Sequence, residues 1–249
     1  MKEQVGILIA VRMKSSRLPK KATRDIIGKP MINHLIERMK RVKNASKIVI
    51  CTSTHPDDKI LLNIADEENV LKYAGSELDV MKRFIEAADE NNLKYIVRVT
   101  GDNPMTDPGN IDSMIKTHID GEFDFTKSEY LPIGANAEVI SLSALKTAYQ
   151  LAEDTQLTEY MTAYLLRPDI FKIHMYINND IFYKNRYKIR LTVDYDEDLQ
   201  LMNIIYTALY KKFPNFSIRE VLEFIDMNPK IVDMNINLYQ IPLPEIKFI

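Results

Sequence analysis

Short apolar runs rich in valine and isoleucine alternate in this chain with longer stretches whose apolar residues recur every three or four positions. This alternation is typical of βαβ units, in which helices pack on a mainly parallel sheet. We therefore predict an α/β fold with a mainly parallel sheet. The expected strands are Val5–Val11, Lys47–Cys51, Tyr95–Val99, Ala137–Ile140, Phe171–Ile177 and Lys188–Val193.

Helical periodicity fills most of the sequence between and after these strands. Between the first two strands, Met31, Leu35, Met39 and Val42 fall at three- and four-residue spacing. This spacing predicts an amphipathic helix that covers one face of the sheet. The other expected helices are Asp57–Asn69, Val80–Asn91, Asn110–Ile119, Ser143–Ala152, Thr155–Leu166, Asp196–Lys211 and Ser217–Asp226.

The chain is interpreted as one domain, 1–249, with two less regular parts. Residues 120–185 interrupt the alternation with Leu131-Pro132 and Asn178-Asn179-Asp180, so we expect a small insert or arm there, a candidate for acceptor binding and dimerisation. After Asn228-Pro229 the pattern is lost, and 227–249 is expected to be a C-terminal tail that lies across a neighbouring surface.

Charge and cysteine content exclude several classes of protein. The chain has 33 lysine and arginine residues and 35 aspartate and glutamate residues, a net charge of -2. This balance argues against a general binder of nucleic acid or of anionic membranes. A single cysteine, Cys51, excludes an internal disulfide framework and a cysteine-rich zinc site. Because no segment has the pattern of a signal peptide or a membrane span, we expect a cytoplasmic protein.

The clearest candidate for ligand binding is the stretch Arg12–Lys21, directly after the first expected strand. The chain's seven glycines form neither the dinucleotide fingerprint nor the P-loop, so a different phosphate-binding device is required. In open α/β sheets, ligands bind beyond the carboxyl ends of strands, where arginine forks and backbone N–H groups can bind phosphate oxygens. The stretch therefore predicts a polyphosphate site, with a solvated basic turn as the alternative. Its five cations and two hydroxyls are Arg12, Lys14, Ser15, Ser16, Arg17, Lys20 and Lys21.

Two aspartates that follow expected strands are candidates for a metal site. Asp102 comes after Tyr95–Val99, and Asp194 comes after Lys188–Val193. Because Mg²⁺ prefers one or two carboxylates together with phosphate oxygens and water, both could hold one Mg²⁺ beside a triphosphate. Each has a structural alternative, an Asx-turn for Asp102 and a helix cap for Asp194.

Smaller polar residues after other strands allow two interpretations. Ser76 and Asp79 have the Ser-x-x-Asp spacing of an acidic capping box. We favour capping for Ser76 and leave capping and nucleotide contact equally open for Asp79. Thr52 and Ser53 end the second expected strand, where hydroxyls either meet a base or ribose or simply form a turn, and we favour the turn.

Seven blocks of sequence, spread over most of the chain, carry a family resemblance. They are Arg12-Met13-x-Ser15-Ser16-Arg17-Leu18-Pro19-x-Lys21, Gly28-Lys29-Pro30-Met31-Ile32, Thr52-Ser53, Gly75-Ser76-x-x-Asp79-Val80, Arg98-Val99-Thr100-Gly101-Asp102-Asn103-Pro104, Glu138-Val139 and Leu191-Thr192-Val193-Asp194-x-x-x-Asp198-Leu199. These blocks resemble the cytidylyltransferase family that activates acidic sugars such as Kdo and acylneuraminates. Within it, they are most similar to the branch of spore coat polysaccharide biosynthesis.

The resemblance implies a three-layer α/β/α, Rossmann-like nucleotidyltransferase fold with a mainly parallel mixed sheet, usually dimeric. It implies transfer of CMP from CTP to an acceptor with release of pyrophosphate. Arg12, Arg17, Lys21 and Asp102 would be catalytic, and Asp102 and Asp194 would bind Mg²⁺. The implied nucleotide-binding residues are Val11, Arg12, Met13, Ser15, Ser16, Arg17, Lys21, Thr52, Ser53, Gly75, Asp79, Thr100, Gly101 and Asp102. The implied acceptor-binding residues are Asn103, Glu138, Glu159 and Thr162.

The sequence departs from the family pattern at two places. Relatives carry Arg-Glu-His-x-Thr where this chain has Thr158-Glu159-Tyr160-Met161-Thr162. The change removes a cation and an imidazole from the implied acceptor pocket, so the sequence leaves the acceptor open. Lys20 stands where relatives have glycine, and its side chain disfavours a positive φ.

The leading interpretation is an Mg²⁺-dependent cytidylyltransferase that makes a CMP-linked sugar, sugar acid or related compound for a surface polysaccharide or glycan. Two other classes fit parts of the sequence. A nucleotide-sugar-dependent glycosyltransferase would use an Asp-x-Asp at its metal, and Asp194-x-Asp196 matches that tripeptide. A non-catalytic nucleotide-binding relative would fit the altered Thr158 and Tyr160.

Overall fold

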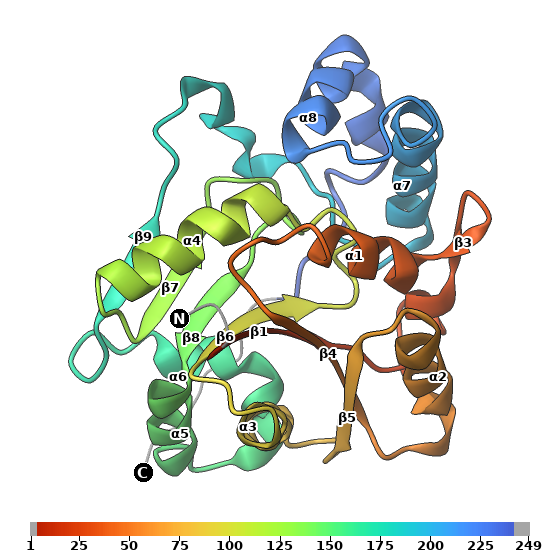
Figure 1. Ribbon diagram of the computed structural model, residues 1–249. Helices are drawn as coiled ribbons and strands as arrows, with labels where there is room; N and C mark the ends of the chain where they lie inside the picture. Colours follow the sequence, from red (N-terminus) through yellow and green to blue (C-terminus); the bar gives the residue numbers. More distant parts are fainter. Residues whose placement is uncertain (1–3, 242–249) are drawn as a thin grey trace.

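A seven-stranded sheet forms the centre of the molecule (Figure 1). The computed structural model describes residues 4–241, apart from the side chains of residues 156 and 157. Along the sheet the strands are β5 (Leu71–Gly75), β4 (Lys47–Ser53), β1 (Val5–Ala10), β6 (Tyr95–Thr100), β8 (Glu138–Ser141), β7 (Phe125–Ser128) and β9 (Ile173–Tyr176).

The sheet is mixed but mainly parallel. β1 pairs in parallel with β4 on one side and β6 on the other, which places the first strand in the interior of the sheet. β8 is antiparallel to both of its neighbours, β6 and β7. The loops that follow β1, β4 and β6 therefore leave the sheet at one edge, where ligands bind in open α/β sheets.

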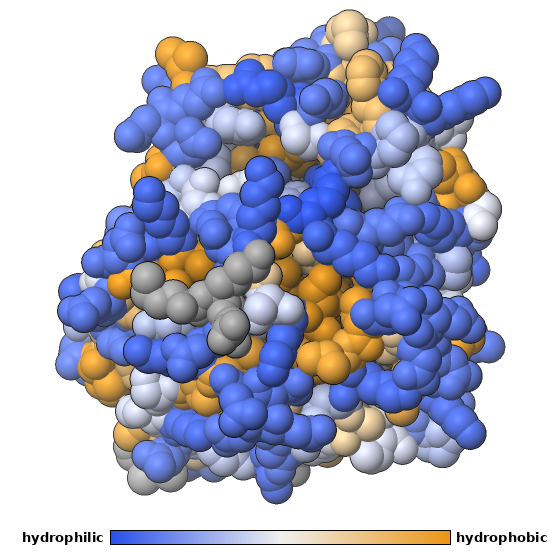
Figure 2. Space-filling view, viewed as in Figure 1, coloured by the Kyte–Doolittle hydropathy of each residue, from blue (hydrophilic) through white to orange (hydrophobic). Residues whose placement is uncertain are grey.

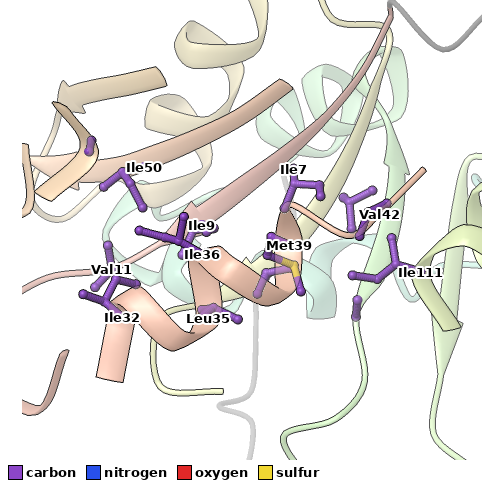
Figure 3. Close-up of a cluster of buried hydrophobic side chains, with 14 of the residues drawn as sticks. Ile7, Ile9, Val11, Ile32, Leu35, Ile36, Met39, Val42, Ile50 and Ile111 are labelled. Atoms are coloured by element: carbon purple, nitrogen blue, oxygen red, sulfur yellow. The ribbon is translucent and has the colours of Figure 1, made fainter. Parts of the chain in front are cut away.

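Helices cover both faces of the sheet, which gives the predicted three-layer α/β/α architecture (Figure 1). On one face, α1 (Met31–Met39), α2 (Lys59–Glu67) and α4 (Pro108–Asp120) pack on the side chains that alternate along β1, such as Ile7 and Ile9 (Figure 3). On the other face, α3 (Val80–Glu90), α5 (Leu142–Gln150) and α6 (Met161–Leu165) pack on Leu8, Phe125 and their neighbours.

Two further helices, α7 (Asp196–Leu209) and α8 (Ile218–Met227), make a third hydrophobic cluster (Figure 1, blue). Their apolar faces pack on loop residues, including Leu18 after β1 and Met105 after β6. This cluster holds the loops at the carboxyl edge of the sheet. The remaining elements are a two-stranded ribbon, β2 (Asp25–Ile26) and β3 (Lys29–Pro30), and short 3-10 helices at Lys21–Thr23, Pro56–Asp58, Thr155–Tyr160, Ile181–Tyr183, Arg186–Lys188 and Pro229–Met234.

The prediction of a strand at Lys188–Val193 is wrong. A short 3-10 helix, Arg186–Lys188, replaces its start, and the rest makes only an isolated bridge between Ile133 and Arg190. The segment runs past loops and not along another strand, so its N–H groups bind loop carbonyls. Among these, Val193 N donates to Asp102 O at 2.9 Å.

Other differences concern shorter elements. β5 and β7 were not predicted, and the expected helix Thr155–Leu166 is divided into a 3-10 helix and α6. The range 120–185, in which we expected an insert or arm, contributes β7, β8 and β9 to the sheet. Of the expected tail 227–249, the structure describes residues up to 241, and the end of that prediction, residues 242–249, lies outside the described residues.

The face shown in Figure 2 is mostly hydrophilic, with hydrophobic side chains exposed in several areas between the hydrophilic ones. Within residues 4–241, no helix is long and apolar enough to cross a membrane. Cys51 is buried in the sheet, and burial raises the pKa of its thiol to about 12. It is therefore a packing residue and not a reactive thiolate.

Candidate active site

The loop after β1 is fixed by two buried side chains and by one aspartate. Val11 and Met13 are buried, and Met13 N donates to Asp58 Oδ1 at 2.6 Å. Asp58 is itself buried and also accepts from the backbone N–H and the hydroxyl of Ser53 at the end of β4. Asp58 thus ties the basic loop to the neighbouring strand. Asp58 was not predicted as a site residue from the sequence, although an aspartate shortly after the end of a strand is a usable signal.

Close packing brings the loop after β6 against the loop after β1. Gly101 N donates to Ala10 O at 2.8 Å, and a Cβ at Gly101 would lie 2.6 Å from Val11 Cγ2. Only glycine fits at this distance, so close packing against Val11 explains why the Thr100-Gly101-Asp102 block has a glycine at this position.

Lys21, Asp102 and Asp194 form the centre of the site. Lys21 Nζ donates to Asp102 Oδ2 at 2.7 Å and to Asp194 Oδ1 at 3.0 Å. Arg17 Nη2 donates to the same oxygen of Asp194 at 2.7 Å. Two cations of the loop therefore meet the two aspartates proposed as metal ligands, although the three segments are far apart in the sequence.

The charges of this cluster determine its pKa values. Burial alone would lower the pKa of Lys21, but Asp102 and Asp194 outweigh it and raise that pKa above 10.5. Burial would likewise raise the pKa of Asp102, but the charge and hydrogen bond of Lys21 and the Thr100 hydroxyl lower it below 3.8. Lys21 and Asp102 are both charged at neutral pH.

Asp194 is positioned by a second, fully buried group of charges. Arg190 Nη2 donates to Asp194 Oδ2 at 2.9 Å, and Arg190 also makes two hydrogen bonds to Asp198. Asp198 accepts from the backbone N–H groups of Asp194 and Tyr195 and forms the capping box of α7. The expected alternative, Asp194 as the N-cap of this helix, is therefore wrong, because Tyr195 occupies the N-cap position and Asp198, the third helical residue, accepts from its backbone N–H.

Arg17 and Arg12 offer cationic groups on either side of the loop. Arg17 lies over the ring of Tyr195 at 5.3 Å, and its Nη1 is buried with no partner in the part of the chain that the structure describes. Arg12 donates to Glu77 O at 2.9 Å and to Glu159 Oε2 at 3.2 Å. Ser15 Oγ accepts from Leu18 N at 3.4 Å, and Ser16 is exposed. The loop is thus a folded turn with cations held at set positions.

Asp79 is the N-cap of α3. Its Oδ1 accepts from Lys82 N at 3.0 Å and from the Thr158 hydroxyl at 2.9 Å, and its Oδ2 accepts from Tyr149 at 2.8 Å. Ser76 Oγ accepts from Asp79 N at 3.1 Å. Asp79 therefore caps the helix, one of the two interpretations left open for it. The capping role favoured for Ser76 is wrong, because Ser76 lies three residues before the N-cap and its hydroxyl only binds the backbone N–H of Asp79. Gly75, the last residue of β5, precedes this turn.

The remaining predicted nucleotide residues lie close to the site but differ in exposure. Thr52 and Ser53 are both buried; the Thr52 hydroxyl has no partner within residues 4–241, whereas that of Ser53 binds Asp58. Thr100 donates to Asp102 Oδ1 at 2.7 Å and accepts from Asn103 Nδ2 at 2.7 Å. Asn103 and Thr100 therefore hold the Asp102 carboxylate in place.

The predicted acceptor residues come from three elements. Glu138 on β8 accepts from Arg98 Nη1 at 2.9 Å and stands opposite both Arg98 and Lys127 in the sheet register. Arg98 and Lys127 are cations that the sequence analysis did not assign, although their strand positions put them on the face of Glu138. Glu159 is exposed beside Arg12, and Thr162 is buried in α6.

The donor set at the centre fits Mg²⁺. Within the described range 4–241, no cluster of three or more histidine, cysteine, aspartate or glutamate side chains suited to a metal ion is found. Asp102 and Asp194 nevertheless share one ammonium group, so both carboxylates already face one positive charge. Two carboxylates, completed by phosphate oxygens and water, are the ligands that Mg²⁺ prefers.

Lys20 adopts the conformation that its side chain disfavours. Its φ is 55° and its ψ is 31°, in the left-handed region. The backbone path that suits a glycine is thus retained, at a conformational cost of about 1 kcal/mol. The Lys20 side chain therefore raises the energy of the turn but does not prevent the positive φ.

Comparison with known proteins agrees with this fold. The family model described as cytidylyltransferase matches residues 6–225. An uncharacterized protein of Methanocaldococcus jannaschii is 31% identical over 246 residues, 98% of each chain. The spore coat polysaccharide biosynthesis protein SpsF of Bacillus subtilis is 29% identical over 228 residues, 89% of this chain and 94% of its own. A solved cytidylyltransferase of Leptospira borgpetersenii superposes with a TM-score of 0.87 at 28% identity, covering 95% of this chain and 99% of that one. The chain therefore belongs to the cytidylyltransferase family and is a nucleotidyltransferase.

Proposed function

We propose that this protein transfers CMP from CTP to a hydroxyl of a sugar, sugar acid or related small acceptor, with Mg²⁺ and with release of pyrophosphate. The observation that carries the proposal is the contact of Lys21 with both Asp102 and Asp194. The contact brings a cation of the basic loop and two carboxylates together at the carboxyl edge of a mainly parallel sheet, which supports a triphosphate and metal site there.

The basic loop binds the triphosphate. Arg12, Arg17 and Lys21 would contact its oxygens, and the unpartnered Nη1 of Arg17 offers a donor for them. In the free protein, the carboxylates neutralise Lys21 and Arg17. When CTP binds, phosphate oxygens replace those carboxylates at the cations, which frees Asp102 and Asp194 to bind a metal. Asp102 and Asp194 would hold Mg²⁺, which supplies charge neutralisation of the transferring and leaving phosphate groups when bound.

The acceptor oxygen attacks the α-phosphorus of CTP, the new P–O bond forms, and the bond to the pyrophosphate oxygen breaks. The acceptor hydroxyl loses its proton to solvent or to a phosphate oxygen. The protein's part is to orient the two reactants, through the loop on one side and Asn103, Glu138, Glu159 and Thr162 on the other.

The cations beside Glu138 bear on the class of acceptor. Arg98 and Lys127 flank this carboxylate on one face of the sheet and suit an acceptor that combines hydroxyls with an anionic group. Thr158 does not supply such a group, because it is buried and donates to Asp79. We therefore place the anion-binding groups of the acceptor pocket on β6 and β7.

The glycosyltransferase alternative is less well supported. Its Asp-x-Asp would use Asp194 and Asp196 at one metal. Asp194 is buried with Lys21, whereas Asp196 is exposed and pairs with Arg24 at 3.0 Å. The two carboxylates have different partners and different environments.

We extend the proposal to the setting of the reaction. The product would serve a surface polysaccharide or glycan, as the name of the Bacillus subtilis relative suggests. The enzyme would act in the cytoplasm, where CTP is available, and as a homodimer. Exposed apolar residues at Ile177 and Ile181, in 120–185, support the dimer. Sedimentation at several concentrations tests it, and a monomer at all of them contradicts it.

The reaction is tested by pyrophosphate release with each of the four ribonucleoside triphosphates, Mg²⁺ and a panel of sugar, sugar-acid and phosphorylated acceptors. We expect release with CTP and one class of acceptor, and none without acceptor. Transfer of the sugar from a CMP-sugar to a second acceptor, without release of pyrophosphate from CTP, would favour the glycosyltransferase. Equal release with and without every acceptor would contradict the proposed transfer.

A further inference from the structure

A cavity lies between the C-terminal part of α1, the helix α7 and the segment before α8. Its volume is about 260 Å³, and its walls include His34, Arg38, Arg41, Tyr206, Tyr210 and Phe216. Lys21, Asp102 and Asp194 are not among the lining residues, so the cavity is separate from the candidate active site.

Two arginines of this cavity share one neutral acceptor. Arg38 is 4% exposed and donates through Nη1 to Phe216 O at 3.0 Å and through Nε to Thr106 O at 3.0 Å. Arg41 donates to the same Phe216 oxygen at 3.4 and 3.3 Å. In the region from residue 4 to 241, no carboxylate lies within the 4.0 Å ion-pair limit of either guanidinium. Buried charges are normally paired, so the buried Arg38 and the half-buried Arg41 lack a counter-ion in this part of the chain.

One carboxylate, Glu37, also lines the cavity, but it is paired with other groups. Glu37 binds Lys29 and accepts from Tyr210. Burial lowers the pKa of Arg41, the charge of Arg38 lowers it further, and Asp107 and Glu220 oppose this only at longer range. The cavity therefore has a net positive wall.

Two buried nitrogens in the cavity wall have no partner within the described chain, Arg38 Nη2 and His34 Nδ1. His34 is 1% exposed, and its Nε2 lies 2.9 Å from Ile26 O. Because a carbonyl only accepts, Nε2 carries the hydrogen and Nδ1 is an acceptor. Arg38 Nη2 is a donor. The wall thus lacks an anionic acceptor for the arginine and a hydroxyl or amine donor for the histidine.

We propose that this cavity binds a small hydroxylated oxyanion, with a phosphate or carboxylate group on Arg38 and Arg41 and a hydroxyl at His34. Phosphate and carboxylate both match the guanidinium fork. The volume exceeds that of a lone phosphate and is close to the lower end for small-molecule sites. The remainder of the ligand packs on Tyr210 and Phe216.

The test is a titration followed by two-dimensional amide NMR, with inorganic phosphate, glycerol 3-phosphate and malate as probes. Shifts of the Arg41 and Phe216 amides report this cavity, and those of Arg17 and Lys21 report the active site in the same experiment. Arg41→Met removes one cation whose hydrogen bonds are long, so the fold is retained. Lys43→Met removes an exposed cation two residues away and is the control with the same charge change.

We expect saturable shifts at Arg41 and Phe216, with affinity at least about tenfold weaker in Arg41→Met and within about twofold of wild type in Lys43→Met. Saturation by glycerol 3-phosphate and not malate assigns the site to phosphate esters, and the reverse assigns it to hydroxy acids. The proposal is overturned by absence of saturable shifts with all three probes, or by equal weakening in both variants.

Discussion

Behind the loop 11–21, the buried or half-buried cations Arg17, Lys21 and Arg190 each contact a carboxylate. In the cavity between α1 and α7, the hydrogen bonds that Arg38 and Arg41 donate within residues 4–241 all go to backbone carbonyls. Both regions place positive charge at the edge of a hydrophobic cluster, but among the residues that the structure describes, carboxylates pair with the cations of the first region only.

The two regions therefore illustrate two kinds of anion-binding site, which differ in the groups that contact the cations before a ligand binds. Where carboxylates pair with the cations, their attraction offsets part of the desolvation cost of burial, and a ligand that displaces the carboxylates must bring a metal to replace the lost pairing. A metal nucleotide meets that requirement. Where the cations contact only carbonyls, an anionic ligand alone can neutralise them. Such a site is therefore expected to bind an anion without a metal.

Among the substitutions in the first region, we expect the largest effect from one that removes a carboxylate of the active site, and we expect that effect on catalysis. Asp102→Asn removes the carboxylate that Lys21 contacts and should lower kcat/KM by about 10²–10³-fold, because it removes charge where the phosphates and metal are held. Steady-state pyrophosphate release measures this. Asp196→Asn, a change at an exposed carboxylate, is the control and should leave kcat/KM within about twofold. Equal losses in the two variants would place the reaction elsewhere.

Arg190, which positions Asp194, should make the largest contribution to stability in the same region. Arg190→Met leaves Asp198 buried without its cation and removes one of the three cations that contact Asp194, which should lower the free energy of unfolding by about 3–5 kcal/mol. Urea denaturation of the variant and of wild type measures the difference. Arg24→Met breaks an exposed ion pair and should change stability by less than about 1 kcal/mol. A loss for Arg190→Met no larger than this would show that the buried pairs are not required.

His118 is a buried titratable group whose ring nitrogens contact neutral hydroxyls, so it can be compared with the buried charges of both regions. Its ring nitrogens contact Thr126 and Ser141, and burial lowers its pKa from 6.5 to about 4. The neutral form is therefore favoured in the folded state, so stability is complete above pH 6.5 and falls as the pH decreases toward 4. We expect a loss of about 3 kcal/mol over that interval, measured by urea denaturation at each pH. The His118→Asn variant should lack this part of the pH dependence; an unchanged slope would assign it to other groups.

The smallest expected effect concerns the backbone of the basic loop. Lys20→Gly should raise stability by about 0.5–1 kcal/mol, because glycine accepts the positive φ of 55° without strain. Lys14→Gly is the matched control, since Lys14 is exposed and does not have a positive φ. Thermal unfolding should show a higher midpoint for the first variant only. A lower midpoint for Lys20→Gly would mean that the lysine side chain stabilises the turn.

Sequence reasoning was most successful where the signal was local. The alternation of apolar runs and the Arg12–Lys21 loop predicted the central strand and the position of the basic loop, because periodicity and neighbouring charge are visible within one segment. β5 (Leu71–Gly75) was missed because it is a short edge strand whose residues are at most half-buried, so its apolar pattern is weak.

Contacts between distant segments could not be predicted in the same way. Lys188–Val193 has the composition of a strand, but whether it forms one depends on a partner strand, which the fold does not provide. Asp58 and Arg190 act through hydrogen bonds to residues that only the fold brings near. The convergence of Asp102 and Asp194 was predicted, but Asp194 arrives from a loop and not from a strand end.

The most direct test of the account is a crystal structure of the protein soaked with CTP and Mn²⁺ as an anomalous substitute for Mg²⁺. We predict an anomalous peak in contact with Asp102 and Asp194, with the Lys21 ammonium and Arg17 turned to phosphate oxygens. A nucleotide bound with its phosphates away from Lys21, or a metal peak that contacts neither aspartate, would contradict the central claim.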